Sequence, residues 1–235
     1  MQRLVPVFAL CQCSTLTRLR FAAGRANVRE IPDWGNSMSG ANDHENHIKS
    51  KVSRLPPMPL PPDPITQKMF DEQHARGGHI LNMHLVNAHA PRLADAKRKM
   101  TYALRNECKA TRKMRELVIV RTAALCEQPY ELKHHYPMAL QCGFTEAQVK
   151  AAMGDWREEH FEPAERALLA YVDCLCLKRG DVPDDVFAEL ARYFSPQEIV
   201  ELTHTSTTYW ATGVFIRAMQ IEIDPEDRTT AMGKF

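Results

Sequence analysis

The chain has 235 residues, of which 44% are hydrophobic and 25% charged, a balance typical of a soluble globular protein with one domain of ordinary size. Thirty basic residues against twenty-nine acidic ones leave a formal charge of +1. Nucleic-acid-binding domains normally carry a basic excess or a dense basic stripe, so no nucleic-acid partner is expected. No apolar run approaches the roughly 20 residues needed to cross a bilayer, so no membrane association is expected either.

The cysteines follow no spacing typical of a metal site or a redox pair. Seven of them stand at positions 11, 13, 108, 126, 142, 174 and 176. No two have C-x-x-C spacing, so the sequence offers neither a zinc ribbon nor a thioredoxin-type pair. Cys174 and Cys176 lie two apart in a predicted helix, where their side chains diverge. The odd count favours a reducing compartment, with most thiols free and buried.

Residues 1–50 are predicted to be a disordered or targeting leader. The first 29 residues contain five arginines and no acidic residue, a composition typical of mitochondrial transit peptides. A secretory signal at residues 4–10 and a translation start at Met38 are the alternatives. We expect a cytoplasmic protein, or a mitochondrial one if residues 1–37 are a genuine transit peptide.

Residues 51–65 are predicted to form an extended, proline-rich arm. The segment LPPMPLPPDP at residues 55–64 has six prolines in ten positions. Each proline fixes φ and removes an amide donor, which favours a polyproline-like conformation. Such an arm serves as a linker or wraps over a neighbouring subunit, and a ligand for a proline-binding domain is a further alternative.

Residues 66–224 have helical periodicity throughout, without the alternating runs that indicate strands. Proline at first-turn positions and two capping boxes, Thr145 with Gln148 and Ser195 with Glu198, mark where helices start. Gly143 is expected to end a helix in the left-handed conformation. The predicted helices cover residues 94–108, 112–125, 129–141, a short segment after 145, 164–177, 186–193 and 195 to about 223.

The fold class is therefore all-α, a compact helical bundle over residues 66–224 followed by a tail at residues 225–235. The helix at residues 112–125 has a dense apolar centre and is expected to be buried on most sides. The longest helix, which Asp224-Pro225 is expected to close, places one set of residues on a single face. These are Ile199, Leu202, Ser206, Tyr209, Gly213 and Ile216.

Glu131 and His135 are the first candidates for chemistry. They stand four apart on one predicted helix, so their side chains share a face. A carboxylate beside an imidazole fixes its tautomer and raises its basicity, which suits acid–base catalysis near neutral pH. A solvated surface pair is the alternative. His135, Ala139 and Gly143 follow at intervals of four, which directs the histidine toward small, closely packed residues.

Residues around this pair resemble the core motif of the carboxymuconolactone decarboxylase family, part of the wider superfamily that includes alkyl hydroperoxidase D. The resemblance rests on Arg115-Glu116-Leu117, Ala123-Ala124, Tyr130-Glu131, His135, Ala139 and Gly143. It extends over about residues 66–224. It implies the compact all-α bundle of that family and a homo-oligomer such as a dimer, trimer or hexamer.

The resemblance also implies which branch of the superfamily the chain fits. In the peroxidase branch, a C-x-x-C pair occupies the positions of Gln128 and Glu131, so both redox cysteines are missing. Cys126 lies near the first of these positions and leaves a one-cysteine activity open. Glu116 matches a retained family glutamate, and Tyr130 stands where that branch has a second histidine. Glutamate at the second cysteine position favours the decarboxylase-like branch, which needs neither metal nor organic cofactor.

We therefore expect His135 to act as general acid/base, Glu131 as its partner and Glu116 as a second relay carboxylate. An ion pair of Glu116 with Arg112 or Arg115 is the alternative for that residue. The expected substrate is a small carboxylate-bearing lactone or related ring-cleavage product. Residues expected to bind it are Tyr130, His134 and His204, the last from the polar run at residues 203–208.

Two other functions stay open. One is a thiol-dependent hydroperoxidase of the alkyl hydroperoxidase D type, and the other is a non-catalytic member of the fold. HExxH, P-loop, GxGxxG and GxSxG motifs are missing from the sequence, which argues against zincins, P-loop enzymes, Rossmann dehydrogenases and serine hydrolases.

Overall fold

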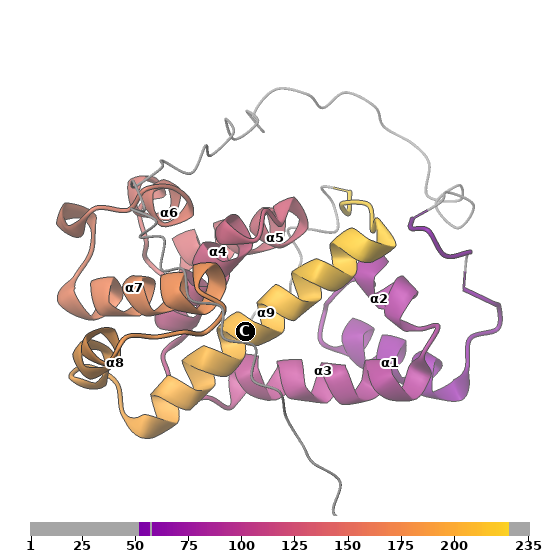
Figure 1. The fold of residues 1–235 in the computed structure, drawn as a ribbon. Helices are drawn as coiled ribbons and strands as arrows, with labels where there is room; N and C mark the ends of the chain where they lie inside the picture. Colours follow the sequence, from indigo (N-terminus) through magenta and orange to yellow (C-terminus); the bar gives the residue numbers. More distant parts are fainter. Residues whose placement is uncertain (1–51, 57, 226–235) are drawn as a thin grey trace, which may run out of the picture. The chain divides into compact units, whose positions relative to one another are not determined.

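The computed structural model describes residues 52–56 and 58–225, and over these residues it is helical without strands (Figure 1). The predictions for residues 1–50 and for the tail beyond residue 225 lie outside the described residues. In chain order the elements are α1 Pro64–Ala75, α2 Asn82–Asn87, α3 Pro91–Asn106, α4 Arg112–Leu125, α5 Pro129–Gln141, α6 Glu146–Met153, the 3-10 helix η1 Glu158–His160, α7 Pro163–Leu177, α8 Asp184–Ala191 and α9 Pro196–Met219.

Local start signals account for most of the helix boundaries. Proline opens α1, α3, α5, α7 and α9, where its missing amide and fixed φ cost nothing. Both predicted capping boxes are present, at the starts of α6 and α9. Gly143 follows α5 with φ +94°, a conformation that residues with a Cβ adopt at a cost.

The predicted end of the longest helix is wrong. α9 ends at Met219, and Gln220 follows in the left-handed conformation with φ 51°. Asp224 does not cap the helix but is buried, and its carboxylate accepts a hydrogen bond of 2.7 Å from the amide of Asn82. This bond crosses 142 positions, so no local pattern reports it.

The start of the proline-rich arm contacts its own chain. The Arg54 amide donates to the Met219 carbonyl at 2.9 Å, and the Glu222 amide donates to the Val52 carbonyl at 3.1 Å. Ser53 is buried. This part of the arm therefore lies along the segment that follows α9, which completes the backbone pairing there.

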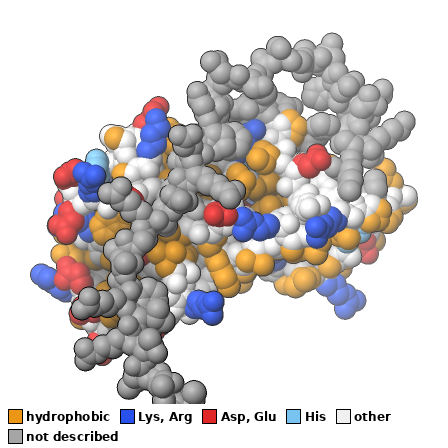
Figure 2. Space-filling model, turned by 45° about the horizontal axis from the view of Figure 1, so that its top comes forward, with side chains coloured by type: hydrophobic (Ala, Val, Ile, Leu, Met, Phe, Trp, Pro, Cys, Tyr) orange, Lys and Arg blue, Asp and Glu red, His pale blue; other side chains and the backbone are white. Residues whose placement is uncertain are grey.

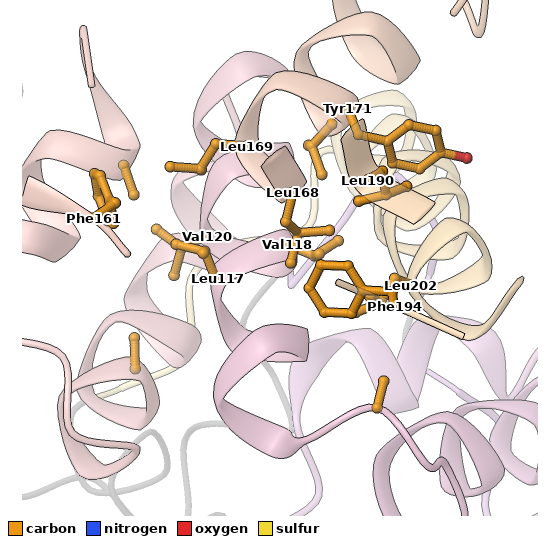
Figure 3. Close-up of a cluster of buried hydrophobic side chains, with 14 of the residues drawn as sticks. Leu117, Val118, Val120, Phe161, Leu168, Leu169, Tyr171, Leu190, Phe194 and Leu202 are labelled. Carbon is orange, nitrogen blue, oxygen red and sulfur yellow. The ribbon is translucent and has the colours of Figure 1, made fainter. Parts of the chain in front are cut away.

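The apolar centre of the molecule lies around α4, which contacts α5, α6, α7 and α9. Its buried positions include every residue from 115 to 123, as expected for a helix surrounded on most sides. Figure 3 shows the packing of α4 side chains against α7, α8 and α9. The labelled residues are Leu117, Val118, Val120, Phe161, Leu168, Leu169, Tyr171, Leu190, Phe194 and Leu202. Burying these side chains is the main source of the stability that holds the site residues in place.

Charged side chains of both signs are interspersed with hydrophobic ones on the face shown in Figure 2, in keeping with the net charge of +1. Within the described part of the chain, none of the helices is long and apolar enough to span a membrane. The predicted face of α9 is confirmed, since Ile199, Leu202, Ser206, Tyr209, Gly213 and Ile216 are all buried.

Candidate active site

A buried ion pair between α4 and α5 forms the centre of the candidate site. His135 Nδ1 lies 2.8 Å from Glu116 Oε2, within hydrogen-bonding distance, and the side chains are only 3% and 5% exposed. Neighbouring positions on α4 and α5 pack against each other, which brings together residues 19 apart in the sequence. The carboxylate fixes the orientation of the imidazole, as a supporting group does in acid–base catalysis.

Glu131 is the looser partner of this histidine. Its Oε2 lies 3.7 Å from His135 Nε2, and its buried Oε1 has no hydrogen-bond partner. The sequence correctly brings the three residues together, but it predicts the order of the two glutamates wrongly. The i, i+4 spacing places Glu131 over the ring without aligning it, whereas Glu116 approaches from another helix and makes the hydrogen bond.

The two carboxyl groups titrate in opposite directions from their ordinary values. Burial pushes the pKa of Glu116 upward, but the charge and hydrogen bond of His135 outweigh it and hold that pKa below its usual range. Burial raises the pKa of Glu131, because the nearby His135 and His134 compensate only in part. Two carboxyls whose pKa values are pushed apart are the arrangement that divides base and acid roles.

A small cavity of about 20 Å³ adjoins Glu116, with room for about one water molecule. Its walls come from α3, α4 and α9. They consist of Leu104, Arg105, Arg112, Arg115, Glu116, Ile119, Thr205 and Tyr209. Three guanidinium groups around so small a space make its electrostatic environment favourable to an anion, and guanidinium geometry matches that of a carboxylate.

His135 lies directly behind the wall of this cavity. Its ring packs edge-on against Tyr209, with ring centroids 4.9 Å apart and planes at 89°. Glu116 and Tyr209 therefore contact His135 and also line the cavity. A proton that moves between His135 and the cavity has a short path through the carboxylate of Glu116.

The remaining predicted site residues do not line the cavity. The hydroxyl of Tyr130 donates to Asp224, and Nε2 of His134 lies 3.4 Å from the same carboxylate, so both side chains belong to a separate buried polar cluster. His204 is exposed on the outer face of α9. Substrate binding by these three residues is thus a wrong prediction for the cavity seen here, because each points to a different environment.

The polar run around His204 is explained largely by helix packing. The hydroxyls of Thr203, Thr205 and Thr207 each bond to a carbonyl one turn back. Of these, only Thr205 also borders the cavity. The lining residues that sequence reasoning missed are Arg105 and Tyr209, and Arg112 and Arg115 were considered only as ion-pair partners of Glu116. The one available signal was the spacing of Arg112, Arg115 and Glu116 over one helical turn.

The described residues contain no group of three or more His, Cys, Asp or Glu side chains placed to hold a metal ion. His135, with its two glutamates, is the constellation that comes nearest, and its geometry is that of a proton-transfer triad. Its donor set offers one imidazole and two carboxylates, of which one carries a raised pKa.

Comparison with solved structures defines the class of the fold as that of alkyl hydroperoxidase D-like proteins. An uncharacterized peroxidase-related protein from Ralstonia eutropha JMP134, described as an AhpD core, superposes with TM-score 0.66 and 19% identity over 79% of this chain and 100% of its own. One from Silicibacter sp. TM1040 gives 0.68 and 17% over 76% and 95%. The debrominase Bmp8 with 2,3,4-tribromopyrrole gives 0.62 and 19% over 77% and 95%.

Residues 91–173 match the carboxymuconolactone decarboxylase family, so the chain belongs to that family through the segment that carries Glu116, Glu131 and His135. This confirms the resemblance found in the sequence and the all-α fold. A comparison with curated proteins finds no match.

Proposed function

We propose that the protein is a cofactor-independent, carboxymuconolactone decarboxylase-like lyase that acts on a small carboxylate-bearing lactone or related ring-cleavage product. The observation that carries this proposal is the cavity in which three arginines and Glu116 meet, directly in front of His135. The arginines supply the positive charge that a carboxylate substrate requires, and the triad supplies the proton that a decarboxylation consumes.

Substrate recognition falls to the arginines in this scheme. Arg115 is largely committed to structure, since its guanidinium donates to the carbonyls of Ala110 and Arg105. Arg112 is at the first residue of α4 with a side chain one-third exposed, and its Nε lies 3.7 Å from Glu116 Oε1. Because the cavity holds about one water, the substrate enters as Arg112 swings outward and then pairs with the guanidinium.

The chemical step is the loss of carbon dioxide followed by protonation. The bond between the carboxylate carbon and the ring breaks, and its electron pair stays on the ring as an enolate. The proton on His135 Nδ1 passes to Glu116 and from there to the ring carbon, which neutralises the enolate. Glu131, whose raised pKa favours its protonated form, returns a proton to His135 Nε2.

Replacing His135 tests the proposal. Carbon dioxide release from a panel of small carboxylactones is measured for the wild type and for His135→Ala, with folding checked by circular dichroism. We expect a loss of about 10²- to 10⁴-fold in kcat, the usual contribution of general acid–base catalysis. Arg112→Gln is expected to act mainly on KM, because it removes a binding charge and leaves the proton relay in place.

The matched control is His74→Ala, which removes an exposed histidine from α1. It is expected to keep wild-type kcat and KM. Turnover of the best lactone that survives His135→Ala unchanged contradicts the proposal. Absence of carbon dioxide release from every carboxylactone by the folded wild type contradicts it as well.

A further inference from the structure

A second, larger cavity lies on the opposite side of Gln128 from the candidate active site, where the end of α4 meets α7 and α9. Its volume is about 430 Å³, and we call it the thiol groove. Its lining residues are Leu125, Cys126, Glu127, Gln128, Cys176, Trp210, Val214, Arg217 and Ala218. A groove of this size accommodates a small organic molecule.

Two cysteines from distant parts of the chain meet in this groove. Cys126 is the C-cap residue of α4, and Cys176 lies in the last turn of α7. Their thiols lie within hydrogen-bonding distance of each other, and both are partly exposed. A disulfide bond of about 2.0 Å therefore requires only a small approach of the two sulfur atoms.

Cys176 has the surroundings of a reactive thiolate. Its Sγ lies 3.9 Å from Ser206 Oγ, which in turn lies 2.9 Å from Thr122 Oγ1, and both hydroxyls are buried. Hydrogen bonds from the Cys126 thiol first, and then from Ser206 and Thr122, lower the pKa of Cys176 to about 7 against the effect of burial. A thiolate held by several donors at neutral pH is the nucleophilic form of cysteine.

Cys126 has the complementary character. Its hydrogen bond to Cys176, followed by burial, raises the pKa of its thiol well above the ordinary value. It stays protonated while Cys176 is a thiolate. Once the Cys176 sulfur becomes part of a mixed disulfide, the neighbouring negative charge is gone and the Cys126 thiol ionises more readily. The pair thus has an attacking and a resolving member.

The groove walls indicate what such a pair acts on. Trp210 and Val214 are each 50% exposed on α9, and Leu125 and Ala218 continue the apolar surface. An ion pair at 2.9 Å between Arg217 and Glu127 lies at the exposed edge, so the lining adds no uncompensated charge there. A neutral, apolar or aromatic molecule is the occupant that this lining favours.

We propose that Cys126 and Cys176 form a dithiol site for thiol–disulfide exchange with small apolar disulfides bound in the thiol groove. The Cys176 thiolate attacks one sulfur of the bound disulfide, whose S–S bond breaks and releases the first thiolate. Cys126 loses its proton and attacks the Cys176 sulfur, and the second thiolate leaves. Two protein thiols are oxidised to one disulfide, and one bound disulfide is reduced to two thiols.

The test uses the full chain and one equivalent of dithiodipyridine, a neutral aromatic disulfide that releases coloured thiopyridone. The wild type is expected to release two thiopyridones for each probe consumed, and peptide mapping is expected to recover the Cys126–Cys176 disulfide. An isolated thiol releases only one, since it stops at the mixed disulfide.

Single replacements separate the two roles. Cys126→Ser is expected to release one thiopyridone and to keep the probe on Cys176, whereas Cys176→Ser is expected to lose at least 90% of the fast phase. The matched control, Cys142→Ser, removes another partly exposed cysteine and is expected to behave like the wild type. Release of one thiopyridone by the wild type, or a fast phase that survives in Cys176→Ser, overturns the proposal.

This inference does not rest on the proposed lyase activity. His135→Ala leaves every groove residue in place and is expected to keep the two-thiopyridone reaction. Cys126→Ser fails here independently of carbon dioxide release. The two sets of measurements therefore fail separately.

Discussion

The two sites share α4 but have opposite environments. In the middle of that helix, Glu116 meets His135 and three arginines in a space of about 20 Å³, where charges are buried and hydrogen-bonded. At its C-terminal end, Cys126 meets Cys176 in an open groove of about 430 Å³ with apolar walls. Proton transfer gains from a rigid, dry environment, and exchange with a disulfide needs access.

This contrast shows how one helix serves two kinds of chemistry. The residues between the two sites, Val118 to Ala123, are buried and include the packed centre of the molecule. They hold both ends of α4 in place without lining both cavities. Because no side chain lines both cavities, we expect perturbations at one site to leave the other unchanged.

The largest expected effect comes from Glu116→Gln. The neutral amide leaves His135 without its anionic partner and removes the carboxylate through which its proton reaches the cavity. Lyase turnover is expected to fall by about 10²- to 10⁴-fold, as for loss of a general acid–base group. The same protein is expected to release two thiopyridones at the wild-type rate. A parallel loss in both assays contradicts the separation of the two sites.

A smaller effect is expected from Trp210→Ala in the thiol groove. Removing an aromatic wall costs stacking worth about 0.5–1.5 kcal/mol, which corresponds to roughly two- to tenfold slower reaction with dithiodipyridine. Lyase kcat and KM are expected to stay at wild-type values. Tyr193→Ala, which removes another partly exposed aromatic side chain but lies outside the groove lining, is the matched control. Equal slowing by both replacements contradicts binding of the probe against Trp210.

Much of the fold was predictable because its signals are local. Prolines, capping boxes and Gly143 act within one turn of the residues they affect, and the structure has the predicted starts of α4, α5 and α9 within one residue. The end of α9 was not predictable in this way. Gln220 takes the left-handed conformation without the usual glycine, and Asp224 is held by Asn82 and Tyr130 from far along the chain.

The candidate site was predictable only in its membership. The family motif brought Glu116, Glu131 and His135 together, but the hydrogen bond that ranks them depends on how α4 packs against α5. The contribution of Arg105 from α3 and the meeting of Cys126 with Cys176 depend on tertiary packing alone. Sequence spacing reports neighbours within one element, and these pairs lie in different elements.

The smallest expected effect concerns Glu131 and the pH dependence of stability. Burial raises its pKa in the folded state, so folding favours its protonated form. The stability that this group contributes is fully present below its unfolded pKa and is lost as the pH rises through the folded value. Glu116 has the opposite sign, because its lowered pKa adds stability that disappears as the pH falls.

Glu131→Gln therefore separates the two terms. The amide cannot ionise, so the decline in stability above pH 4.5, the ordinary glutamate value, is expected to disappear, while the acid limb set by Glu116 remains. At pH 7 the variant is expected to be more stable than the wild type by on the order of 1 kcal/mol, since a buried carboxylate oxygen without a partner is replaced by a neutral group. Denaturant unfolding between pH 4 and 8 measures the difference. If the variant and the wild type show the same pH dependence, Glu131 is not the protonated reserve behind His135, and the acid role belongs to another group.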